Sequence, residues 1–136
     1  MTGVSNVLRG GTMLNYILLY VGSALPLLWG ISHLFPTRSV VEGFGDISLE
    51  NKRIIMMEWI IEGVSLIFIG FLVASVTFVD YTNSISRTIY WLSFAMLNTL
   101  SLVSVFTGFK VGFLPFKLCP FIFTTSSILI VLGGYL

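Results

Sequence analysis

Four long apolar stretches dominate this sequence, at residues 14–35, 54–79, 88–109 and 113–135. A helix needs about 20 mostly apolar residues to cross the hydrocarbon core of a bilayer, and each stretch reaches that length. Lipid offers no water to an open backbone, so helices are expected, and the ten-residue alternation of a membrane β-barrel is absent. The sequence therefore predicts an all-α protein, a transmembrane four-helix bundle.

Charge is scarce throughout the chain. Only 10% of the 136 residues are charged, and seven Lys and Arg stand against six Asp and Glu. A soluble domain of ordinary composition carries about 25% charged residues, and a nucleic-acid partner would require a basic face. The composition thus excludes a soluble globular domain and a nucleic-acid-binding protein, and it leaves the lipid bilayer as the first partner.

The connectors differ in length. Residues 36–53 form the one long polar loop, whereas residues 80–87 and 110–112 form short links. Short links place consecutive helices side by side and antiparallel, so we expect a single membrane domain over residues 1–136. Within the long loop, Ser48 is a plausible N-cap for the second spanning helix.

Basic residues favour one orientation of the bundle. Five lie in or near the first and third connectors, and two lie on the opposite side; they are Arg38, Lys52, Arg53, Lys110 and Lys117 against Arg9 and Arg87. Basic loops stay in the cytoplasm. We therefore expect loop 36–53 to be cytoplasmic and both termini to lie outside, in the cytoplasmic (inner) membrane of a prokaryote.

Two acidic residues in the second span require an explanation. Glu58 and Glu62, in the string MEWIIEG, are spaced i,i+4 and lie on one helix face, with Glu62 about 12 Å beyond Ile54. Intramembrane acids are costly and point first to function. Two neighbouring carboxylates in a low dielectric are not both expected to ionise, which suits a proton carrier or a general acid/base. The structural alternative is an ion pair with Lys52 or Arg53 together with hydrogen bonds to His33 or Asn98.

The other candidate residues lie on the first and third spans. His33 ends the first span, and chain reversal through the loop should bring it to the depth of Glu58; alternatively its ring lies at the interface with a wet tip. An asparagine in hydrocarbon usually bonds to another helix. We expect a ligand pocket lined by Trp29, His33, Glu58, Trp59, Glu62 and Asn98, with Glu62, Glu58 and His33 as the catalytic set if the protein is an enzyme.

Other features have plainer interpretations. Trp59, Tyr90 and Trp91 are expected near the membrane interfaces, and the small residues Gly63 and Gly70 should allow close helix packing on a face away from the glutamates. The single cysteine, Cys119, is expected to be an inert packing residue and cannot form an internal disulfide.

No cofactor can be assigned from the sequence. With one histidine and no Glu-x-x-His spacing, the chain lacks the pattern of a bundle metal centre, so no metal ligands are predicted. No Walker A or GxGxxG motif occurs, and neither GxSxG nor HExxH is present.

Residues 28–70, LWGISHLFPTRSVVEGFGDISLENKRIIMMEWIIEGVSLIFIG, resemble the first half of small four-helix proteins in the broad DoxX-like group. The shared features are a Gly-rich first helix ending near a proline, an fG-type turn and an acidic residue early in the second helix. The resemblance implies a four-helix membrane protein, and members linked to redox work act beside partner subunits. The single Cys119 argues against a thiol-redox role here.

Three hypotheses of function follow. The leading one is a membrane protein that binds a small lipophilic or cationic ligand in the acidic pocket, or that serves as an accessory subunit to a partner membrane protein. The second is an intramembrane isomerase or oxidoreductase acting on an isoprenoid, sterol-like or quinone substrate, with Glu62 as acid/base and His33 as proton relay. The third is a proton-coupled multidrug-type transporter that works as a homo-oligomer.

Overall fold

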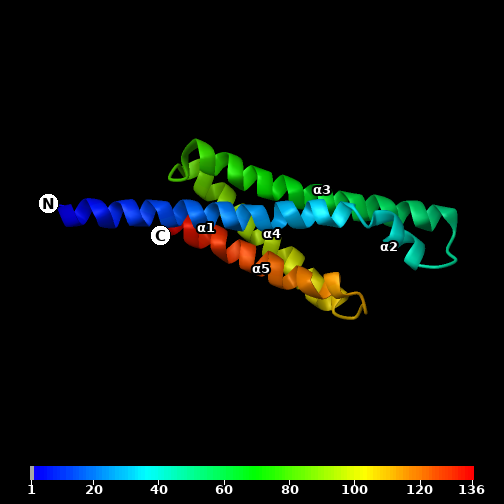
Figure 1. Ribbon diagram of the computed structural model, residues 1–136. Helices are drawn as coiled ribbons and strands as arrows, with labels where there is room; N and C mark the ends of the chain where they lie inside the picture. The colour runs from blue at the N-terminus through cyan, green and yellow to red at the C-terminus, as the bar shows by residue number, and fades with distance from the viewer. Residues whose placement is uncertain (1) are drawn as a thin grey trace.

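The computed structural model describes the backbone of residues 2–136 and the side chains from Met13 onward. These residues form five α-helices and no strand (Figure 1): α1 (Thr2–Leu34), α2 (Thr37–Gly43), α3 (Leu49–Asp80), α4 (Ser84–Gly108) and α5 (Leu114–Tyr135). Four helices are long and apolar enough to cross a membrane, over Met13–Leu34, Leu49–Asp80, Ser84–Gly108 and Leu114–Tyr135. The prediction of an all-α transmembrane four-helix bundle is confirmed.

The region expected as one polar loop, residues 36–53, holds more structure than the sequence suggested. It contains the short helix α2, and α3 begins at Leu49 instead of Ile54. The predicted cap is present, because Ser48 Oγ accepts a hydrogen bond of 3.1 Å from the Asn51 backbone N–H. Capping of this kind satisfies a donor that the first turn leaves open. The remaining connector between α2 and α3 is therefore short.

Small residues allow α1 and α3 to pack almost backbone to backbone. A Cβ at Gly30 would lie 2.6 Å from the Gly63 carbonyl oxygen, and a Cβ at Gly70 would clash with the Ser23 carbonyl oxygen. The expected role of Gly63 and Gly70 in close helix packing is thus confirmed. Their partner is α1, which fixes how α1 and α3 cross.

The helices are unevenly packed around the bundle. Helix α1 packs extensively on both α3 and α5, and α4 packs on α5, whereas α3 and α4 share much less contact. In Figure 1 the α4–α5 pair crosses the α1–α3 pair, and the two pairs separate towards the end that carries α2. The fold is therefore open between α3 and α4 at that end.

Polar side chains turn inward and bond between helices. Asn15 Nδ2 donates 2.8 Å to the Gly133 carbonyl, and Ser126 Oγ donates 2.6 Å to the Gly22 carbonyl. The outward faces are instead apolar, as lipid contact requires. Large exposed apolar side chains include Leu14, Ile17, Val21, Leu28, Ile60, Val64, Phe68, Phe71, Leu92, Leu102, Phe106, Phe121, Ile128 and Leu132.

Two of the three expected interface aromatics lie in the interior. Trp59 is buried, and Tyr90 is fully buried with its hydroxyl 2.9 Å from Thr77 Oγ1. Trp91 is half exposed. Trp59 and Tyr90 therefore do not present their rings to lipid, because each finds a hydrogen-bond partner inside the bundle.

Candidate functional site

His33 occupies the last turn of α1, and Trp59 holds it in place. The two rings stack with centroids 3.8 Å apart and planes inclined by 13°. The Trp59 indole Nε1 also donates a 2.6 Å hydrogen bond to the His33 carbonyl oxygen. Carbonyls in the last turn of a helix lack intrahelical partners, so this bond caps the end of α1. The same residue thereby fixes both the backbone and the ring of His33.

The imidazole faces the carboxylate of Glu62. His33 Nε2 lies 3.4 Å from Glu62 Oε2, yet the nitrogen is buried and makes no hydrogen bond. A buried polar atom without a hydrogen-bond partner costs roughly 1–3 kcal/mol. The side chain of Glu62 is 39% exposed, against 6% for His33. The carboxylate is thus the accessible member of the pair, and the histidine lies behind it.

The close packing of α1 on α3 creates this pairing. Gly30 precedes His33 by one turn, and Gly63 directly follows Glu62 in the sequence. Because these two glycines bring the helix backbones together, the side chains on either side of the contact meet across the interface. The position of the His33–Glu62 pair is therefore a direct result of where α1 and α3 cross.

An inner cavity of about 170 Å³ adjoins His33. Its walls are largely aromatic and apolar, and Trp29 Nε1 points to Cys119 Sγ at 3.4 Å within it. The residues lining it are Trp29, Ser32, His33, Pro36, Trp59, Phe113, Pro115, Phe116 and Cys119. Cys119 is buried, consistent with the expected packing role.

A second cavity, of about 470 Å³, lies on the other side of Trp59 and Phe116 and contains both glutamates. It is formed mainly by α3 and α4, which share much less contact than α1 with α3 or α4 with α5. Its walls carry two carboxylates and no basic side chain; they are Phe44, Ile54, Ile55, Glu58, Trp59, Ile61, Glu62, Ser65, Met96, Leu100 and Phe116. We call this space the lateral cavity.

The structure brings together most of the predicted site and places His33 beside one of the two glutamates. His33 lies beside Glu62, one turn deeper than the Glu58 level expected from the sequence. Among the described side chains, neither glutamate forms an ion pair with Lys52 or Arg53. Of the structural alternative, the ion pairs with Lys52 and Arg53 are thus not present, whereas the contact between Glu62 and His33 is.

Asn98 is the predicted pocket residue that lies elsewhere. Its Nδ2 donates 2.8 Å to the Phe94 carbonyl and 3.0 Å to Ser127 Oγ, and it lines neither cavity. It joins α4 to α5, as the cross-helix bonding expected of an intramembrane asparagine predicts. Asn98 is thus part of the scaffold.

Sequence reasoning missed Phe116, which lines both cavities and separates them together with Trp59. Nothing in its sequence context distinguishes it from the other eleven phenylalanines. Its position depends on the start of α5 meeting α3, which is a tertiary relationship. No group of three His, Cys, Asp or Glu side chains suited to a metal ion occurs within the described part of the chain.

Comparison with known proteins yields no relative: no protein-family model matches the sequence, and neither a curated protein nor a solved structure is significantly similar to it. The class of protein consequently rests on the molecule itself. Four apolar helices with polar groups bonded inside the bundle define a small integral membrane protein. Its site is an intramembrane carboxylate backed by a buried histidine.

Proposed function

We propose that the protein binds a lipophilic cation in the lateral cavity, with Glu62 as the residue that contacts the charged group. The observation that carries this proposal is the lining of the cavity, which combines two carboxylates with apolar side chains and no basic residue. Ligand sites of this kind use apolar walls for affinity and a few polar groups for selection. A positive charge on the ligand would complement the two carboxylates, because no basic side chain lines the cavity.

His33 supports the proposal from behind the carboxylate. Its Nε2 is 3.4 Å from Glu62 Oε2 and has no other polar partner. The buried imidazole lies against one side of the carboxylate and leaves the exposed side of Glu62 free for a cation. In this role His33 positions Glu62 and does not touch the ligand.

A pair of probes with equal shape and opposite charge tests the proposal. Tetraphenylphosphonium and tetraphenylborate can each be titrated calorimetrically into the full chain in detergent micelles. We expect the cation to bind more tightly, and we expect Glu62→Gln to weaken it by about tenfold or more, because the substitution removes a Coulomb attraction on the order of 1–4 kcal/mol between charges a few ångströms apart. Glu50→Gln, on the same helix but outside the lateral cavity, is the matched control.

Equal binding of the two probes would refute recognition of charge. Equal loss in Glu62→Gln and Glu50→Gln would also refute the proposal, because the effect would then reflect general charge and not the cavity. Circular dichroism of each variant at matched concentration establishes that the helices remain intact.

An intramembrane enzyme acting on an isoprenoid, sterol-like or quinone substrate is the second candidate. The observation that favours it is the direct contact between an acid and a base at a cavity formed between two loosely packed helices. Glu62 would exchange a proton with the substrate and His33 would relay it. Deuterium incorporation into an isoprenoid alcohol, recovered after incubation with the protein in heavy water, would support this function, provided that Glu62→Gln abolishes the incorporation.

The proposal also covers the orientation of the protein in the membrane and the group of proteins to which it belongs. Most of the basic residues lie at or near the end of the bundle that carries α2; they are Arg38, Lys52, Arg53, Lys110 and Lys117. The positive-inside rule then supports a cytoplasmic α2, with both termini outside, in a prokaryotic inner membrane. We also retain membership of the DoxX-like group, supported by four spans and an acidic pair early in the second.

A further inference from the structure

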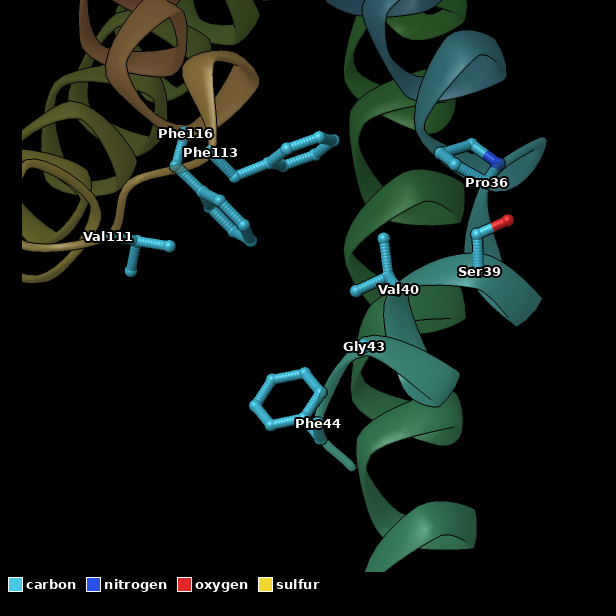
Figure 2. A pocket seen from close by; sticks show the side chains of 8 residues that line it. All are labelled: Pro36, Ser39, Val40, Gly43, Phe44, Val111, Phe113 and Phe116. Atoms are coloured by element: carbon cyan, nitrogen blue, oxygen red, sulfur yellow. The ribbon is translucent and has the colours of Figure 1, made fainter. Parts of the chain in front are cut away.

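A third cavity, of about 380 Å³, lies between α2 and the turn that joins α4 to α5. Figure 2 shows Val111, Phe113 and Phe116 on one wall and Val40 and Phe44 on the other. Although α2 is only seven residues long, its groove-facing positions follow a helical spacing. They are Pro36, Ser39, Val40, Gly43 and Phe44. We call this space the end groove.

The groove is apolar but lies at a charged end of the molecule. Phe44, Val111 and Phe113 remain 55%, 42% and 47% exposed. Such a surface is unfavourable in water and suits a hydrocarbon chain. The ends of the spanning helices lie at the level of the lipid headgroups, so an acyl chain can reach the groove from the bilayer.

The charges beside the end groove indicate which lipid headgroup should accompany an acyl chain bound there. Lys110 directly precedes the groove residue Val111, and Lys117 directly follows Phe116. Neither lysine has an acidic partner among the described side chains, and residues 108–118 contain no acidic residue.

The acids of this end do not compensate the two lysines. Glu42 is occupied by Arg38, with the Arg38 Nε 3.0 Å from Oε1 on an exposed face of α2. Asp46 and Glu50 lie beyond α2, and none of the three acids lines the groove. The positive charge beside the groove is therefore left for an external anion.

We propose that the end groove binds one anionic phospholipid of the surrounding bilayer, with an acyl chain between α2 and the α4–α5 turn and the phosphate near Lys110 and Lys117. The lipid would fill the gap where the two helix pairs separate. The end groove adjoins the lateral cavity through Phe44 and Phe116 but contains neither glutamate. The two lysines line none of the three cavities, and each is next in sequence to a residue of the groove. The proposal does not depend on the nature of the ligand at Glu62.

Native mass spectrometry of the full chain tests the proposal. Phosphatidylglycerol and phosphatidylcholine with identical acyl chains are offered in equal amounts, and the lipid retained on the protein is counted. We expect one phosphatidylglycerol to be retained preferentially. A lysine near a membrane surface contributes a factor of roughly five to anionic-lipid affinity, so Lys110→Gln with Lys117→Gln should reduce that retention by about 25-fold.

Two further variants distinguish the contribution of the lipid headgroup to binding from that of the acyl chain. Lys52→Gln with Arg53→Gln removes the same charge at the same end, away from the groove, and should leave retention unchanged. Val40→Trp fills the groove without altering charge and should reduce the binding of both lipids. Each variant is checked by circular dichroism and by tetraphenylphosphonium binding, which should be unaltered.

Equal retention of the two lipids by the unmodified chain would overturn the proposal. So would an equal loss in the Lys52→Gln, Arg53→Gln control. Displacement of phosphatidylglycerol by millimolar inorganic phosphate would assign the lysines to a free-anion site instead, and it would equally count against a lipid.

Discussion

Trp59 bonds to the backbone of His33 and stacks on the ring of the same residue, with a 2.6 Å hydrogen bond and ring centroids 3.8 Å apart. One side chain of α3 thus closes the end of α1 and orients the imidazole that faces Glu62. This double contact explains why a tryptophan within a membrane span is buried instead of lying at the interface.

Replacing Trp59 by phenylalanine should separate these two contributions. The ring stack on His33 can persist, whereas the indole hydrogen bond is lost, so we expect the protein to be destabilised by about 1 kcal/mol. Thermal unfolding in detergent measures the change as a lower Tm. Trp91→Phe is the matched control, because Trp91 is half exposed. An equal loss of Tm in both variants would contradict the capping role of Trp59.

Gly30→Ala should be more harmful than the same substitution at a helical glycine that has open space around it. The added Cβ would lie 2.6 Å from the Gly63 carbonyl oxygen, a backbone atom that cannot move aside. Overpacking of this kind costs about 1–3 kcal/mol. Moving α1 away from α3 should also weaken tetraphenylphosphonium binding, since His33 and Glu62 would separate.

Gly43→Ala serves as the control for that prediction. Gly43 is also helical, and a Cβ there would meet nothing within 4 Å. Unfolding curves for the two variants should therefore differ clearly. Similar curves would show that close approach of α1 and α3 is not what the glycine at position 30 provides.

Asn98→Ala should reduce stability without affecting the ligand site. The bond from Asn98 to Ser127 joins α4 to α5, and cross-helix bonds of this type contribute about 0.6 kcal/mol on average. A double-mutant cycle with Ser127→Ala measures the coupling, and tetraphenylphosphonium titration should give an unchanged Kd. A weakened Kd in Asn98→Ala would place this residue back in the pocket.

The spanning helices could be predicted because runs of about 20 apolar residues have few other uses. The level at which α1 and α3 cross could not be predicted from the sequence. It depends on the crossing at Gly30 and Gly63 and on α2 occupying part of the connector, and both are tertiary features. That crossing places His33 beside Glu62 and not at the level of Glu58.

Aromatic and amide side chains were harder still to place from sequence. Tyr90 and Trp59 fit an interface or an interior equally well, and only the presence of Thr77 or the His33 carbonyl as a partner decides between them. Asn98 was correctly expected to bond between helices, but the choice of Ser127 required knowing which neighbour α4 packs on. Phe116 gave no signal in the sequence.

The sparse packing of α3 against α4 has a consequence for how a ligand would reach Glu62. Under the proposed function, a ligand would enter between α3 and α4 from the bilayer and not from the aqueous phase. Occupancy will then follow the amount dissolved in the bilayer, so the oil–water partition coefficient of a compound multiplies its intrinsic affinity. A compound with low intrinsic affinity that partitions strongly into lipid should therefore saturate the protein at a low total concentration.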